Sequence, residues 1–202
     1  MTADAIDFML PVIDGLNLPA AQRDSLRPGQ MAMAADGRLR QLPRYFYRVD
    51  SWGLARDMQL TPHFGLWEFI EVDIREAAPL HLFPRYVPCA VTLLAAVLEL
   101  FRFAVGAPVR VAVNGGYRSP SHAQSRDVSL HCWAAAADIF AIGPDLLDSD
   151  DRLDRYGGVA RAVLPFASVL PAFDHLHVEI GYVALVPTGA PGHEDAASLQ
   201  GR

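Results

Sequence analysis

The chain has 202 residues, of which 51% are hydrophobic and 20% charged, a composition typical of a globular protein with room for one sizeable core. Its formal net charge is -6 and it has no dense run of basic residues, so a nucleic acid is not the expected partner. The first residues are acidic where a secretory signal is basic, and no signal peptide is visible. The most apolar stretch, 87–105, contains Glu99 and Arg102, which favours a buried helix over a membrane span.

Three parts are expected along the chain. Residues 1–43 are rich in proline and glycine, which predicts an irregular N-terminal arm that packs on the domain or on a partner. Residues 44–183 form the main domain. Residues 184–202 have the composition of a flexible C-terminal tail. The oligomeric state is not predicted.

Within the domain, periodicity, capping residues and breakers predict elements that alternate in kind. In chain order these are a short strand and turn in 41–54, a helix opened by Thr61, a core helix over 85–104 ending at Gly106, a strand at 109–114, a loop at 119–129, a strand at 135–142, an acidic loop at 144–151, a helix from Arg152 capped by Asp151, and a strand over 173–183. The predicted fold class is α+β, with an antiparallel sheet backed by helices.

Two segments contain side chains suited to a metal ion. His131 and Asp138 lie seven residues apart, and His177 follows near the end of the domain. Two imidazoles and one carboxylate are ligands that a hydrolytic zinc ion takes while one position stays open to water. In a strand, His175 and His177 project from the same face, so both are expected at one site.

These segments also carry a family resemblance. SLHCWAAAAD at 129–138 resembles the Ser-x-His-x-x-Gly-x-Ala-x-Asp motif of the zinc D-alanyl-D-alanine carboxypeptidases, and DHLH at 174–177 resembles their closing Asp-His-x-His. GYRSP at 116–120 and TPHFGLWEF at 61–69 are similar to two further segments of this group, which includes lysostaphin and the hedgehog signalling domain. Three motifs in the right order make the likeness more specific than one short pattern.

The resemblance implies a hedgehog-like or D-Ala-D-Ala-peptidase-like fold and a zinc metallopeptidase that cleaves an amide bond in a peptidoglycan-type peptide. It implies a role for each site residue: His131, Asp138 and His177 as zinc ligands, Asp174 as general base, and His175 and Arg118 as stabilisers of the transition state. This role for Asp174 requires the last strand to be distorted there or to begin after it.

Other readings stay open. Ala134 stands where the motif has glycine, so a positive φ at this position would require the loop to adjust. A zinc-binding module that recognises a peptide or glycan without cleaving it is one alternative, and a phage or toxin-type wall hydrolase is another.

The roles of three further residues are also left open. Glu179 is either a hydrogen-bond partner that orients His177 or a surface carboxylate. Cys89 and Cys132 are expected as reduced thiols, although one disulfide is arithmetically possible.

Overall fold

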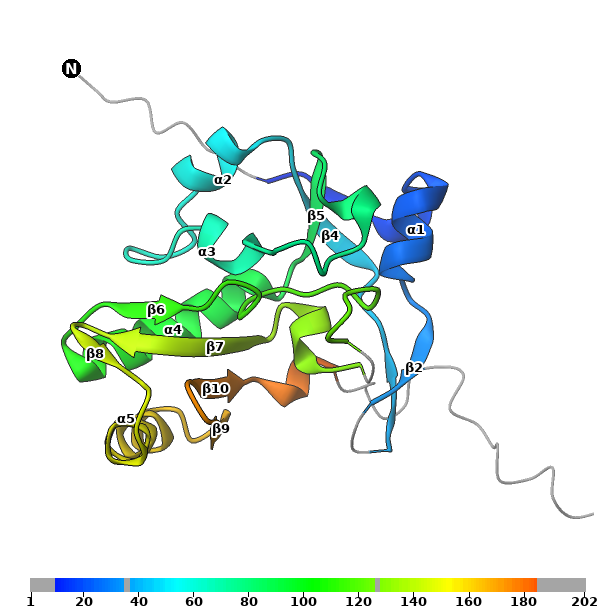
Figure 1. Ribbon diagram of the computed structural model, residues 1–202. Helices are drawn as coiled ribbons and strands as arrows, with labels where there is room; N and C mark the ends of the chain where they lie inside the picture. Colours follow the sequence, from blue (N-terminus) through cyan, green and yellow to red (C-terminus); the bar gives the residue numbers. More distant parts are fainter. Residues whose placement is uncertain (1–9, 35–36, 126–127, 185–202) are drawn as a thin grey trace, which may run out of the picture.

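The computed structural model describes residues 10–34, 37–125 and 128–184. Its main sheet is antiparallel, in the order β6-β7-β10-β9, and β8 also pairs with β7 (Figure 1). The strands are β6 (Val109–Val111), β7 (Ala136–Ile142), β8 (Asp145–Leu146), β9 (Ser168–Pro171) and β10 (Leu176–Glu179). Helix α4 (Val91–Val105) packs against β7, and α5 (Asp150–Val163) packs against α4 and β9. The expected α+β class, with antiparallel sheets and helices, is confirmed.

Helix α4 forms because its apolar residues recur at helical spacing. Leu94, Leu98 and Phe101 point into the core and are all fully buried. Gly106 ends the helix in the left-handed conformation at φ 64°, and its N–H bonds to the carbonyl of Arg102. The predicted C-terminal end of the core helix is therefore correct to within one residue.

The predicted start of that helix is wrong. Residues Arg85–Pro88 form strand β5, which pairs antiparallel with β4 (Tyr45–Val49). Because Pro88 disfavours helical backbone at Val87, the segment is extended, and it satisfies its backbone groups by pairing with β4.

The N-terminal region is more regular than predicted. It contributes β1 (Val12–Asp14) to a second sheet in the order β1-β4-β5, and its other elements are η1 (Gly15–Asn17), α1 (Ala20–Leu26), β2 (Met31–Met33) and β3 (Leu39–Gln41). Leu18, Leu26 and Leu42 are buried in the common core. Of the two options for this region, packing on the domain is the one observed, for residues 10–34 and 37–43.

The helix expected from Thr61 does not form there. Thr61 accepts a hydrogen bond from the backbone N–H of Phe64 at 3.3 Å, as a capping residue does, but the chain then makes a turn. Only α3 (Trp67–Ile70) is helical in this segment; α2 (Trp52–Asp57) precedes it, where a turn was predicted, and η2 (Ala78–Leu80) follows it.

The C-terminal part differs from prediction in detail. Helix α5 begins at Asp150 with Ser149 as its N-cap, two residues before the predicted start at Arg152 and cap at Asp151. Strand β9 was not predicted, β10 is shorter than the expected 173–183, and η4 (Gly181–Ala184) follows it. The role of Asp174 as general base required the last strand to be distorted at Asp174 or to begin after it. Strand β10 begins at Leu176, so this requirement is met. The tail prediction lies outside the described residues, apart from Ala184.

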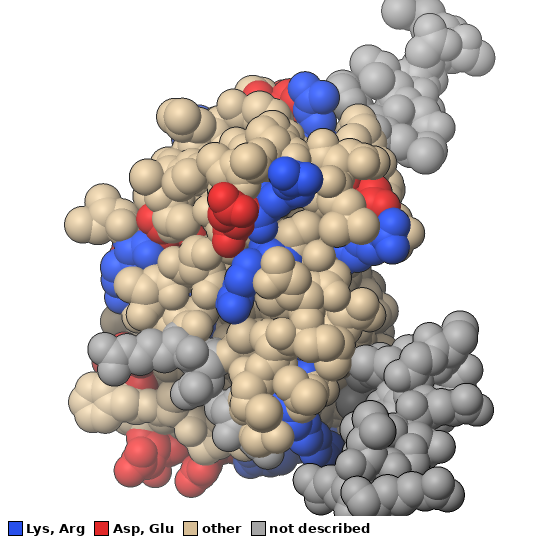
Figure 2. Space-filling view, turned by 90° about the vertical axis from the view of Figure 1, so that its right-hand side faces the viewer, with Lys and Arg blue, Asp and Glu red and all other residues tan. Residues whose placement is uncertain are grey.

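Among the described residues no helix is long and apolar enough to cross a membrane. On the face shown in Figure 2, which carries α1 and β2, arginines and carboxylates lie in several small patches among uncharged side chains, and in several of these patches the two kinds are side by side.

Candidate metal centre

The structure brings the three predicted ligands together. His131 lies in the 3-10 helix η3 (Leu130–Trp133), Asp138 on β7 and His177 on β10. His177 is paired directly with Asp138 across the two strands, so both side chains leave the same face of the sheet. One ligand atom from each residue lies within 4.8 Å of the other two, so the set can hold a metal ion.

The ring of His131 is fixed in one tautomer. Its Nδ1 lies 2.6 Å from the carbonyl oxygen of Gly116, which can only accept, so Nδ1 carries the hydrogen and donates it. Its Nε2 faces Oδ1 of Asp138 at 3.4 Å and has no hydrogen-bond partner, although the side chain is 1% exposed. A lone pair on Nε2 that faces a carboxylate without a hydrogen between them is the arrangement expected when both groups can bind the same cation.

His177 is oriented in the same way by a different partner. Its Nε2 lies 3.1 Å from Oε2 of Glu179, two residues further along β10 on the same face. Its Nδ1 lies 2.7 Å from Oδ1 of Asp138. When Nε2–H donates to Glu179, the Nδ1 lone pair is available to a metal. Both histidines thus turn one ring nitrogen toward the same oxygen.

The charges in the centre are strongly coupled. Burial alone would raise the pKa of Asp138, but its interactions with His131 and His177 hold that pKa well below its usual range. Burial lowers the pKa of His131, which favours the neutral ring that a metal needs. Burial also lowers the pKa of His177, yet Asp138 and Glu179 outweigh it and raise that pKa to about 9. Without a metal, a proton on His177 occupies the position that a cation would take.

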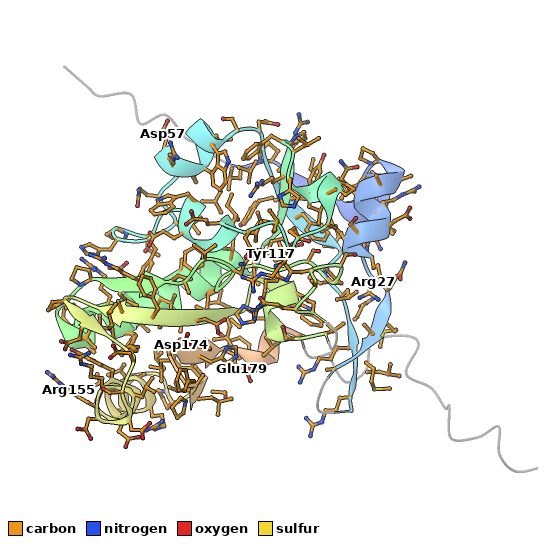
Figure 3. The ribbon with its side chains drawn as sticks, in the orientation of Figure 1. Arg27, Asp57, Tyr117, Arg155, Asp174 and Glu179 are labelled. Atoms are coloured by element: carbon orange, nitrogen blue, oxygen red, sulfur yellow. The ribbon has the colours of Figure 1, made fainter. Side chains whose placement is uncertain are left out.

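His175 and Asp174 form a pair beside the ligands. The Nε2 of His175 lies 3.5 Å from Oδ1 of Asp138, and its Nδ1 lies 2.8 Å from Oδ1 of Asp174. The Asp174 side chain is 71% exposed, so His175 stands between it and the ligand set. Figure 3 shows Asp174 and Glu179 below β7, on the side of the centre formed by β10.

Arg118 reaches the centre from the loop that follows β6. Its Nη2 lies 3.7 Å from Oδ2 of Asp138, and its Nη1 donates to Oε1 of Gln124 at 3.3 Å. Burial lowers its pKa, while the charge of Asp138 opposes that change. Four of the other five predicted site residues therefore face Asp138 directly, and Asp174 is linked to it through His175.

One close backbone approach and one left-handed residue shape the backbone around the centre. Gly116 lies so close to the backbone of Phe69 that a Cβ would overlap it, which explains glycine at this position. Ala134, which stands where the motif has glycine, ends η3 in the left-handed conformation at φ 51° and is fully buried.

Two contributors were missed or undecided from sequence. The Gly116 carbonyl carries no side-chain signal, and only the pairing of two distant loops reveals it. Glu179 is settled as a hydrogen-bond partner of His177, a role that its two-residue spacing on a strand allowed.

Cys89 and Cys132 are both free thiols, and burial raises the pKa of Cys132 to about 11.

Comparisons of the chain with protein-family models, with curated proteins and with solved structures gave no match.

Proposed function

We propose that the protein is a zinc-dependent hydrolase that cleaves an amide bond in a peptide, with zinc held by His131, Asp138 and His177. The observation that carries the proposal is that one ring nitrogen of His131 and one of His177 face the same oxygen of Asp138, while the other nitrogen of each ring is held by a hydrogen bond. Two nitrogen ligands and one oxygen ligand favour zinc over the hard cations magnesium and calcium, which prefer oxygen alone.

Three protein ligands leave one coordination position for water or substrate, which is the pattern of catalytic zinc sites. When bound, the metal would polarise a carbonyl and acidify a water molecule. The side chains around the ligands supply what hydrolysis needs besides the ion, because Arg118 and His175 both lie within 4 Å of Asp138.

The chain's own residues divide the proton and charge work. His175 faces the centre through Nε2, and Asp174 accepts from its Nδ1, so the pair can take a proton from water and return it to the leaving amine. In this arrangement Asp174 acts through His175. The Arg118 guanidinium lies where it can donate to an oxyanion.

The substrate class comes from the resemblance of residues 60–182 to the D-alanyl-D-alanine peptidase and hedgehog group. We propose a peptidoglycan-type peptide, a D-Ala-containing stem or cross-link, and a fold of that group. The Asp174–His175 pair favours catalysis over recognition alone, since a binding module has no need of a proton acceptor beside the ligands.

The test combines metal analysis with a substrate panel. The purified protein is expected to bind one zinc per chain, to lose thermal stability on chelation, and to release new amine ends from peptidoglycan or defined muropeptides, detected by mass spectrometry. Cleavage should stop with a chelator and return with added zinc. A zinc-loaded protein that leaves every peptide intact would contradict the hydrolase, and retention of those peptides would instead support a recognition module.

A further inference from the structure

We propose that Glu76, a residue outside the ligand set, is the positioning residue of the centre: it fixes the loop that presents Gly116 to His131 and Arg118 to Asp138. This inference rests on the proposed function only in taking the residues that the loop orients to be a zinc site. Glu76 lies just before η2 and is 6% exposed, an unusual location for a carboxylate.

The Glu76 carboxylate is held by hydrogen bonds, and two of them come from the loop. Its Oε2 accepts from the backbone N–H of Ser119 at 3.0 Å, and its Oε1 accepts from the Ser119 hydroxyl at 2.5 Å. Oε1 also accepts from the backbone N–H of Ala77 at 2.8 Å, which ties the carboxylate to its own segment. Glu76 therefore clamps Ser119, the neighbour of Arg118, to a different part of the chain.

The clamped loop makes the contacts that shape the metal centre. Gly116 accepts from Nδ1 of His131, and the backbone N–H of Arg118 donates to the carbonyl of His131 at 3.3 Å. The Arg118 side chain faces Asp138 from the same short stretch. A shift of this loop would therefore move the carbonyl that holds His131 and the guanidinium that faces Asp138.

Packing alone does not hold the loop at this point. A cavity of about 20 Å³ lies beneath it, lined in part by Glu76, Arg85 and Tyr117. Tyr117, labelled in Figure 3, has a buried hydroxyl with no hydrogen-bond partner, and the same is true of Nε of Arg85. The backbone N–H of Tyr117 donates to the carbonyl of Phe69, and that of Ala123 to the carbonyl of Arg75, which secures the two ends of the loop. The Glu76 bonds to Ser119 secure its middle.

A glutamine cannot replace this carboxylate without loss. Both oxygens of Glu76 accept from a backbone N–H, one of Ser119 and one of Ala77. In either orientation of a glutamine amide, its NH₂ group faces one of those donors, which leaves a buried donor unsatisfied. Glu76→Gln therefore changes the clamp while keeping the size of the side chain.

The test uses the full chain and two independent measurements. Zinc affinity is measured by competition with a chelator, and the His131 ring is observed in the metal-free protein by long-range proton–nitrogen NMR. Wild type should show His131 as a single Nδ1–H tautomer. Glu76→Gln should bind zinc about tenfold or more weakly, as removal of groups that orient metal ligands does. It should also lose the single His131 tautomer.

Two further variants complete the design. Glu99→Gln is the matched control, because it changes a carboxylate that is bonded to Thr61 and His63, away from the centre, and it should leave both measurements as in wild type. Ser119→Ala removes the hydroxyl bond to Glu76, together with the bond that this hydroxyl accepts from the N–H of Ser121, and keeps the backbone bond to Glu76. It should shift both measurements in the same direction by a smaller amount, and it decides the question if Glu76→Gln does not fold. Wild-type zinc affinity and an unchanged His131 spectrum in Glu76→Gln, or in Ser119→Ala should it serve instead, would overturn the proposal. If wild type itself binds no zinc, the proposed function fails, while the His131 spectra still decide the role of Glu76.

Discussion

His177 on β10 lies directly opposite Asp138 on β7, with its Nδ1 2.7 Å from Oδ1 of the carboxylate. This pairing links two strands whose residues are 39 positions apart in the sequence. The geometry of the centre therefore depends on strand register, because a slip by one residue would turn His177 to the opposite face.

Removal of His177 should abolish specific metal binding. His177→Ala takes away one of three ligands, so we expect zinc content to fall from one per chain to a small fraction after dialysis, measured by atomic emission. His63→Ala is the control, since His63 pairs with Glu99 away from the centre and its loss should leave zinc content unchanged. Full zinc content in His177→Ala would count against the ligand assignment.

Glu179 should act on affinity without being a ligand. Glu179→Ala removes the acceptor that holds the Nε2–H of His177, and we expect zinc binding to weaken by about 10- to 100-fold. Asp148→Asn, which changes an exposed carboxylate near the start of α5, is the comparison and should have no effect. Equal affinities of the two variants would show that Glu179 is only a surface charge.

The Asp174–His175 pair should separate catalysis from binding. Asp174→Asn keeps all three ligands, so zinc binding and thermal stability should be close to wild type, while the rate of muropeptide hydrolysis should fall by about 10²- to 10⁴-fold. If the variant keeps full activity with zinc bound, Asp174 is not needed for proton transfer. His175→Ala then tests the neighbouring ring, which lies nearer to Asp138.

The backbone at Ala134 can be tested by stability alone. Ala134 has φ 51°, whereas Ala137 is equally buried but extended in β7. Glycine removes one methyl group at either position but relieves strain only at Ala134, so Ala134→Gly should be more stable than Ala137→Gly by about 1–2 kcal/mol. Urea unfolding of both variants measures the difference, and equal losses would indicate that φ at Ala134 carries no strain.

The local features of the site could be predicted from the sequence. His131 and Asp138 lie in one short segment, and a strand through His175 and His177 was expected to send both to one face, so the residue types and their spacing indicated a common centre. In the structure β10 begins at Leu176, and His175 reaches the centre from the residue before it. Arg118 depended on the resemblance, since a lone arginine in a loop gives no signal of its own. The structure places it beside Asp138.

What could not be predicted depends on pairing between distant segments. The stretch Arg85–Pro88 continues the apolar pattern of α4, and only its pairing with β4 marks it as a strand. The four residues of β9 have no strong alternation and are extended because β10 lies beside them. The same holds for Glu76, whose partner Ser119 is 43 residues away.

The order of the ligands along the chain also bears on how the protein assembles. His131 and Asp138 form a local half-site in η3 and β7, but His177 arrives only when β10 has paired with β7, after α5 and β9 have been made. A metal ion held by all three residues would therefore cross-link the last strand, β10, to β7 in the middle of the chain. Protection of the C-terminal segment from proteases would then rise with metal occupancy. The ion would thus stabilise the fold against local unfolding in addition to its chemical role.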